Sequence, residues 1–311
     1  MHEDFGTPNT QEEKVESLLH LYIDGGLPRR EMIQRLTRLV GGSAAAMATL
    51  ETAGLAQVNP GACPAGIQVA ENDPAIQWQD VTFPGDAGAV RGLLARPRNQ
   101  TVAQPGVIVI HENRGLVEHI RDVTRRFAKA GFVALGIDLL SRQGGTAAFA
   151  DDTARIAAYG RTLAPDRYND IYSAIDYLKV QPMVVWDRIG AIGFCAGGGN
   201  VYYGAFWKMP LQAGISFYGS PPNPLPPAEN LSFPLLNVFS ETDRNQAARI
   251  PELVTAMVAA RINFGLHLYK GTGHGFHNDT SPIYNPAAAC DVWAKSLEFL
   301  NTHLRAPRPA A

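Results

Sequence analysis

The sequence predicts an α/β fold in which a mainly parallel sheet is flanked by helices, with a helical extension at the N-terminus. From about residue 75, short apolar runs alternate with helical stretches, as strands and their crossover helices do. Before that point, apolar residues recur mainly at helical spacing. The chain has 311 residues, 46% of them hydrophobic, which is enough for one large core. We therefore expect a helical extension over residues 1–70 and an α/β domain over residues 71–306.

The N-terminal extension has two interpretations. Its apolar residues fit two amphipathic helices that are broken at residues 24–28. They are Leu18, Leu19 and Tyr22, then Met32, Ile33, Leu36, Leu39 and Val40. This pattern favours a helical cap or the arm of a homodimer in a cytoplasmic protein. The alternative is a twin-arginine export signal to the periplasm, because Arg29-Arg30 precedes a weakly apolar stretch over residues 39–50. The long charged segment before the arginines favours the first interpretation.

Eight apolar runs are the expected strands. The first two, at residues 81–83 and 90–95, flank Pro84-Gly85-Asp86-Ala87-Gly88 and predict an opening hairpin. The other six are residues 107–110, 132–137, 189–194, 213–217, 235–239 and 266–269. Their continuous apolar character is typical of strands that are buried on both faces.

Helices are expected between these strands. Ile171, Ala174, Ile175 and Leu178 follow the i, i+3, i+4, i+7 rule. Another helix is expected to run over residues 123–130 and to end at Gly131, and the last over residues 292–300. Residues 221–227 contain five prolines among seven positions and predict a loop.

Charge and cysteine usage exclude several classes of partner. Lys and Arg number 27 against 29 Asp and Glu, with no basic run, so neither a nucleic acid nor a membrane surface is expected as partner. No stretch approaches the roughly 20 uncharged apolar residues of a membrane span. The odd count of Cys63, Cys195 and Cys290, without a CxxC pair, argues against a disulfide framework and a structural zinc site. We expect a small-molecule partner and at least one free thiol.

The segment with the clearest chemical meaning is Gly193-Phe194-Cys195-Ala196-Gly197, where an apolar strand runs into an expected helix. Glycines two residues before and after a nucleophile allow the tight strand-to-helix turn that exposes its side chain. The helix N-terminus favours a thiolate, and the N–H of Ala196 is left to meet an oxyanion. The alternative is a buried, inert cysteine in a glycine-rich packing turn.

Chain order supports the catalytic interpretation. In hydrolases with this turn, the acid and then the histidine follow the nucleophile, each after a later strand. Asp243 follows the strand that ends at Phe239, and His274 follows the strand that ends at Tyr269. Their loop positions favour them over the rival acid Glu241 and the rival base His277.

These motifs resemble the dienelactone hydrolase family of the α/β-hydrolase superfamily. The resemblance covers about residues 75–304 and includes His111-Glu112-Asn113-Arg114-Gly115-Leu116 and His274-Gly275-Phe276-His277. It implies the α/β-hydrolase fold, a Cys195–Asp243–His274 triad and hydrolysis of esters or lactones, as in carboxymethylenebutenolidase. It also implies that neither an organic cofactor nor a metal is needed.

The resemblance further assigns residues around the triad. Glu112 would hydrogen-bond the resting thiol and move away when substrate arrives, and Asn113 would give the second oxyanion N–H. The alternative for Glu112 is a salt bridge to Arg114 or Arg121. Arg142 falls where the family holds a substrate carboxylate, although it also fits a solvated loop residue. Asn278 stands where a second such arginine belongs, so we expect neutral short esters to compete well with acidic lactones.

Three other functions compete with this hypothesis. A metal hydrolase would use His111, Glu112, His274 and His277, but these residues lack the ligand spacing of known zinc sites. A dinucleotide enzyme is disfavoured, because neither glycine-rich turn completes GxGxxG after a first strand. A non-catalytic ligand-binding or redox-sensing protein on the same fold would keep a reactive Cys195 without turnover.

Overall fold

The structure is a computed structural model that describes residues 65–305, residues 29–42 and a few single positions between residues 10 and 49. The chain divides into two compact units, Met1–Val58 and Asn59–Ala311. The boundary expected at residue 70 stays a prediction, because residues 50–64 lie outside the described part.

The first unit contains the amphipathic helix α2, Arg29–Val40. Its Met32 and Leu36 are fully buried in a small apolar cluster with Leu18 and Ala46, so the helix predicted around residues 32–40 is confirmed. Most positions of the other predicted helix, and most of the apolar stretch after residue 42, lie outside the described residues. Among the residues that are described, no helix is long and apolar enough to cross a membrane.

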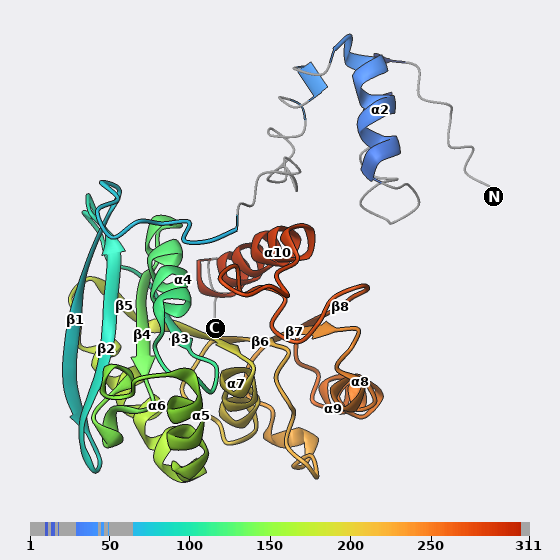
Figure 1. Ribbon diagram of the computed structural model, residues 1–311. Helices are drawn as coiled ribbons and strands as arrows, with labels where there is room; N and C mark the ends of the chain where they lie inside the picture. The colour runs from blue at the N-terminus through green and yellow to red at the C-terminus, as the bar shows by residue number, and fades with distance from the viewer. Residues whose placement is uncertain are drawn as a thin grey trace. The chain divides into compact units, whose positions relative to one another are not determined.

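The second unit is built on one eight-stranded sheet with the order β1-β2-β4-β3-β5-β6-β7-β8 (Figure 1). The strands are β1 Ile76–Gly85, β2 Gly88–Pro97, β3 Gln104–Ile110, β4 Val133–Asp138, β5 Val184–Phe194, β6 Ala213–Phe217, β7 Leu235–Ser240 and β8 Phe264–Tyr269. The β1–β2 hairpin pairs antiparallel to β4, and every pair from β4 to β8 is parallel. All eight predicted strands are therefore present, in a mainly parallel sheet.

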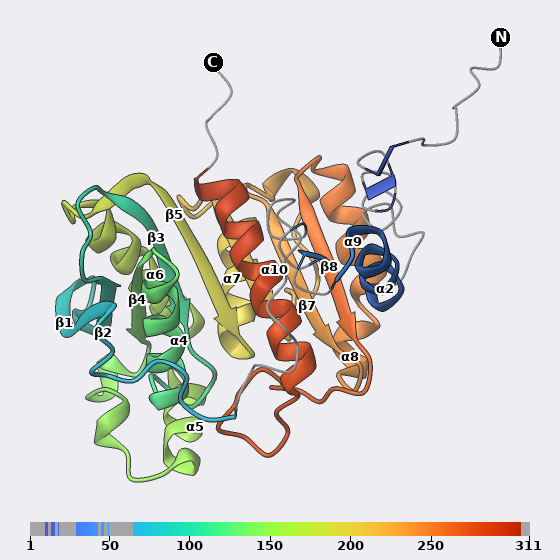
Figure 2. The same cartoon turned by 90° about the horizontal axis from the view of Figure 1, so that it is seen from above.

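Helices cover both faces of this sheet (Figure 2). They are α4 Glu118–Lys129, α5 Asp152–Arg161, α6 Ala164–Lys179, α7 Ala196–Phe206, α8 Arg244–Ala247, α9 Ile250–Ala259 and α10 Pro286–Leu304, with 3-10 turns at Ser141–Gln143, Thr146–Ala148 and Ala228–Asn230. Helices α4 and α10 pack with one apolar cluster, whereas α5, α6, α7 and α9 pack with the other. The two faces of the sheet thus form two cores, and the strands between them are buried on both sides.

Two details differ from the sequence prediction. The hairpin strands extend well beyond the apolar runs that marked them, because β1 also contains exposed polar residues, Gln79, Asp80 and Thr82. Cys195 is a free thiol, in keeping with the expectation of at least one, and Cys290 in α10 is disulfide-bonded, a pairing that the argument against a disulfide framework did not foresee. Cys63 lies outside the described residues. The proline-rich segment 221–227 is a loop, as predicted.

The parallel register brings several predicted side chains to one edge of the sheet. Ile110 pairs with Gly193, Phe194 with Phe217 and Ser240 with Tyr269. The loops that follow these strand ends carry Glu112, Cys195, Asp243 and His274. The carboxyl ends of parallel strands are where open α/β sheets bind their ligands.

Candidate active site

Cys195 occupies a strained turn between β5 and α7. Its backbone has φ 54° and ψ −114°, a conformation that costs a non-glycine residue about 1 to 3 kcal/mol. A Cβ at Gly193 would lie 2.1 Å from the carbonyl oxygen of Gly197, and one at Gly197 would lie 2.4 Å from that of Ile110. The glycines are therefore required by close backbone contacts, as the sequence predicted.

Backbone N–H groups are available beside the thiol. Cys195 itself is anchored by its N–H, which donates to the carbonyl of Phe217 at 2.9 Å. Within residues 65–305, the N–H groups of Ala196 and Asn113 donate to no backbone carbonyl. Ala196 opens helix α7, where N–H groups lack intrahelical acceptors and carry the positive end of the helix dipole.

Asp243 and His274 meet on the neighbouring loops. The Nδ1 atom of His274 lies 2.9 Å from Oδ2 of Asp243, and the Ser240 hydroxyl donates to the same oxygen at 2.6 Å. The side chain of Asp243 is 15% exposed and that of His274 39%. The rival acid Glu241 is exposed and instead accepts from the N–H of Gly271.

His274 also contacts Cys195. The pKa of His274 is raised to about 9, chiefly because the imidazole hydrogen-bonds Cys195; the charges of Cys195 and Asp243 add to this effect and burial opposes it. A protonated imidazole beside the sulfur stabilises the thiolate. The measured contact in this group is the one between His274 and Asp243, and Cys195 is the largest cause of the raised pKa of the imidazole.

Glu112 is buried and is bound to an arginine. The Nη2 atom of Arg114 donates to its Oε2 at 2.5 Å, and the amide of Asn278 lies 3.5 Å from the same oxygen. The salt bridge to Arg114, one of the two alternatives expected from the sequence, is thus present. Arg121 pairs with Asp80 instead.

The two predicted substrate-binding residues have other partners. Arg142 binds Asp170 through Nε at 3.1 Å and Nη2 at 2.8 Å, and it also pairs with Asp86. An anionic substrate would have to compete with these carboxylates, so the structure does not support Arg142 as an anchor. The side chain of Asn278 is buried and accepts from the backbone and hydroxyl of Thr280.

The other two histidines of these motifs, His111 and His277, are buried and have structural contacts. His111 is fully buried, and its Nε2 accepts from the N–H of Leu139 at 2.9 Å. His277, the rival base, is buried against the rings of Phe194 and Phe217, and burial lowers its pKa well below the ordinary value. In the part of the chain that is described, no three His, Cys, Asp or Glu residues form a group that could hold a metal ion.

Comparison with known proteins identifies the family. The profile of the dienelactone hydrolase family matches residues 90–304. The chain belongs to the dienelactone hydrolase family. The predicted α/β-hydrolase fold and the predicted class of ester or lactone hydrolase are thereby confirmed.

Relatives in this family match the chain over nearly the whole of their own length. Proteins named as carboxymethylenebutenolidases from Saccharolobus solfataricus and Synechocystis sp. are 30% and 33% identical; they cover 71% and 72% of this chain, which matches 97% and 96% of their lengths. A Klebsiella pneumoniae crystal structure described as a dienelactone hydrolase superposes with a TM-score of 0.67 at 25% identity, covering 73% of this chain and 98% of its own.

The sequence did not single out two residues that contact the candidate site. Ser240 binds the carboxylate of Asp243, and Tyr218 is a fully buried residue whose ring centroid lies 5.1 Å from that of His274. Both stand at or just after the end of a parallel strand. That position was the one available signal, and it does not say which way a side chain points.

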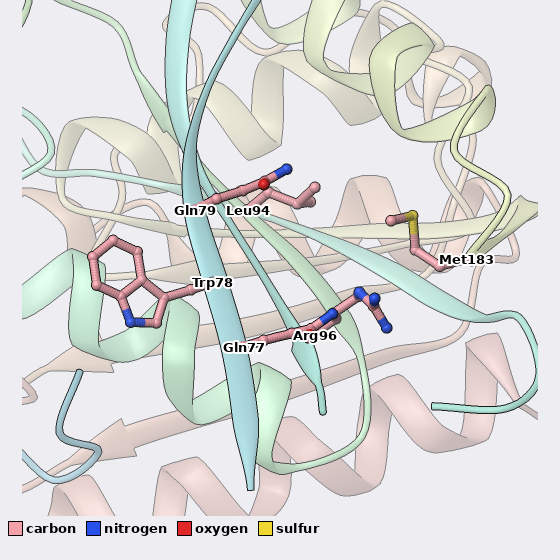
Figure 3. A pocket seen from close by; sticks show the side chains of 6 residues that line it. All are labelled: Gln77, Trp78, Gln79, Leu94, Arg96 and Met183. Atoms are coloured by element: carbon pink, nitrogen blue, oxygen red, sulfur yellow. The ribbon is translucent and has the colours of Figure 1, made fainter. Parts of the chain in front are cut away.

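A separate hollow lies on the β1–β2 hairpin and shares no residue with the site (Figure 3). It has a volume of about 250 Å³ and is lined by Gln77, Trp78, Gln79, Leu94, Arg96 and Met183. None of these is a residue that the sequence singled out for chemistry.

Proposed function

We propose that this protein hydrolyses carboxylic esters or lactones through a covalent acyl-enzyme on Cys195. The observation that carries the proposal is the position of His274, whose Nδ1 lies 2.9 Å from Oδ2 of Asp243 and whose pKa is raised to about 9, chiefly by the neighbouring Cys195. An imidazole held in this way can keep the sulfur ionised and deliver a proton to the leaving group.

The first half-reaction acylates the sulfur. The thiolate of Cys195 attacks the carbonyl carbon, and the electron pair of the carbonyl bond moves to oxygen. The N–H groups of Ala196 and Asn113 then stabilise the oxyanion, typically by ~3 to 4 kcal/mol per donor. When the tetrahedral intermediate collapses, the ester C–O bond breaks and the leaving alkoxide takes the proton of His274.

The second half-reaction releases the acid. Neutral His274 removes a proton from a water molecule, whose oxygen attacks the thioester carbonyl. The thiolate leaves and the imidazolium is regenerated. Asp243 holds the imidazole in the required tautomer, and Ser240 fixes that carboxylate by donating to Oδ2.

We propose a different resting role for Glu112 from the one that the family resemblance assigns. Because its carboxylate is hydrogen-bonded to Arg114, Glu112 orients this arginine next to Asn113. The Cys195 sulfur then interacts with His274 rather than with Glu112. A Glu112→Gln variant tests the role: the alkylation rate of Cys195 should keep its pH dependence. A shift of that profile would instead assign Glu112 to the thiol.

The experiment for the whole proposal is a pre-steady-state assay with p-nitrophenyl acetate. We expect a burst of p-nitrophenol with one equivalent per Cys195 thiol, followed by slower turnover, and a panel of neutral esters and acidic lactones then ranks the substrates. Stoichiometric labelling of the thiol without turnover would favour the non-catalytic, redox-sensing alternative.

For the N-terminal extension we propose a helical cap or the arm of a homodimer, and a cytoplasmic location. Arg29 and Arg30 begin helix α2, whose Met32 and Leu36 are buried, which supports a folded rather than a cleaved segment. Sequencing the N-terminus of the native protein distinguishes this from periplasmic export, which would remove the segment. Light scattering of the full chain tests the dimer.

A further inference from the structure

The loop that carries His274 is fixed at its far end by a buried carboxylate. Asp279 follows His274 by five positions, and its side chain is 0% exposed. Its Oδ1 lies 3.0 Å from Nδ1 of His119, and its Oδ2 accepts from Nε2 of Gln68 at 3.0 Å and pairs with Arg126. Burial opposes ionisation of this carboxyl, but the hydrogen bond to His119 and the charge of Arg126 outweigh it and lower its pKa below the ordinary value. A charged Asp279 therefore ties the loop to helix α4 and to the segment before β1.

The His274 loop, residues 273–279, has little slack between these two side chains. The N–H groups of Phe276 and Asn278 each donate to the carbonyl three residues earlier, at 3.1 and 2.9 Å. Two successive turns are thereby closed, and the side chain of Phe276 is fully buried. A displacement at Asp279 is therefore passed on to the imidazole.

A second buried carboxylate belongs to the same network but not to the loop. Asp122 of α4 is also 0% exposed, and its Oδ2 accepts from Nε of Arg126 at 2.9 Å. Its oxygens also accept from the N–H groups of Gln68 and Val69, at 3.0 and 2.8 Å. Within residues 65–305, none of its hydrogen bonds reaches the His274 loop. The two acids are thus equally buried and share Arg126 and Gln68, but only Asp279 holds the loop.

We propose that Asp279 is a positioning residue, which holds the imidazole of His274 in place by fixing the end of its loop to α4. The side chain of His274 is 39% exposed, so burial alone does not confine it. Its 2.9 Å contact with Asp243 requires the loop after β8 to keep its distance from the loop after β7. A misplacement of about 1 Å in such a group can cost about 10² in rate. This inference rests on the proposed function, in which His274 acts on Cys195.

The experiment compares Asp279→Asn with Asp122→Asn. Each change keeps the shape of the side chain and removes one of two buried charges that face Arg126, so both variants should lose Tm by similar amounts. Only Asp279→Asn should lower kcat for p-nitrophenyl acetate, by about 10- to 100-fold, because only this change loosens the His274 loop. The rate of Cys195 alkylation at pH 7 should fall in the same variant, since a displaced imidazolium no longer stabilises the thiolate. In Asp122→Asn, kcat and the alkylation rate should stay within about twofold of the wild type.

Equal losses of kcat in the two variants, or a wild-type kcat in Asp279→Asn, would overturn the proposal for Asp279. If Asp279→Asn does not fold, His119→Phe takes its place, because it keeps a ring but removes one donor to Asp279. Its kcat should fall by about threefold or more and recover in His119→Asn, whose amide offers a donor near the position of Nδ1. Equal kcat in the wild type and His119→Phe would then overturn the proposal. Turnover by Cys195→Ala would instead overturn the proposed function, so the two failures are distinguishable.

Discussion

The Nδ1 atom of His274 lies 2.9 Å from Oδ2 of Asp243, and the neighbouring Cys195 is the largest cause of the raised pKa of this imidazole. This pair joins the loop after β7 to the loop after β8. The two loops are adjacent because Ser240 pairs with Tyr269 and Phe194 with Phe217 in the parallel sheet. This connection, and the packing that holds it, have measurable consequences for stability and turnover.

The first prediction concerns pH and stability. The pKa of His274 is raised from 6.5 to about 9, so this group stabilises the fold fully below about pH 6.5 and loses that contribution as pH rises through 9. The Tm difference between the wild type and His274→Gln should therefore be largest near pH 6 and vanish near pH 10. A difference that grows with pH would contradict the assignment. In the control His303→Gln, burial lowers the histidine pKa, so a difference should appear only below about pH 6.5.

The second prediction separates Asp243 from its rival. Asp243→Asn keeps the shape of the side chain but removes the charge that orients His274, so kcat/KM should fall by about 10²- to 10⁴-fold. Glu241→Gln is the matched control, because this acid is exposed and accepts only from the N–H of Gly271 in the described structure. Its kcat/KM should stay within about twofold of the wild type. The reverse ranking of the two variants would show that the acid is Glu241.

The third prediction concerns the turn that presents Cys195. In Gly193→Ala the new Cβ would overlap the backbone of Gly197 at 2.1 Å, so urea unfolding should show a loss of at least about 3 kcal/mol. Gly160→Ala, in helix α5 with open space around the new methyl group, should instead stabilise the fold by up to about 1 kcal/mol. Equal stabilities of the two variants would refute the tight turn.

The fourth prediction concerns Arg142. Its guanidinium pairs with Asp170, whose side chain is 1% exposed, so Arg142→Ala leaves a buried carboxylate unpaired and should cost about 3 kcal/mol. The KM for neutral esters and acidic lactones should change in parallel. An increase in KM for the acidic lactone alone, at unchanged stability, would restore Arg142 as a substrate anchor.

Much of the fold followed from the sequence because its signals are local. Apolar runs marked all eight strands, and the positions of Asp243 and His274 after strand ends pointed to two side chains that lie 2.9 Å apart. The role of Cys195 with them stays a prediction. The partners of Arg142 were not predictable, since Asp86 lies in the hairpin turn and Asp170 on α6. Contacts between residues so far apart in the chain leave no periodic or motif signal.

Other parts of the site depend on conformation rather than on residue type. Glu112 had two plausible partners, and only the position of the Arg114 side chain decides between them. In the sequence Tyr218 is one more aromatic residue after a strand. Its positive φ, and the lack of a hydrogen-bond partner for its hydroxyl among the described residues, appear only in the folded chain. Such strained or unsatisfied positions break local rules, which is why sequence patterns do not reveal them.

The most direct measurement is intact-mass analysis of the wild type and Cys195→Ala after brief exposure to p-nitrophenyl acetate, alongside steady-state turnover. The account predicts one acetyl group on the wild-type protein, mapped to Cys195, and neither adduct nor turnover in the variant. Turnover by Cys195→Ala at the wild-type rate would contradict it.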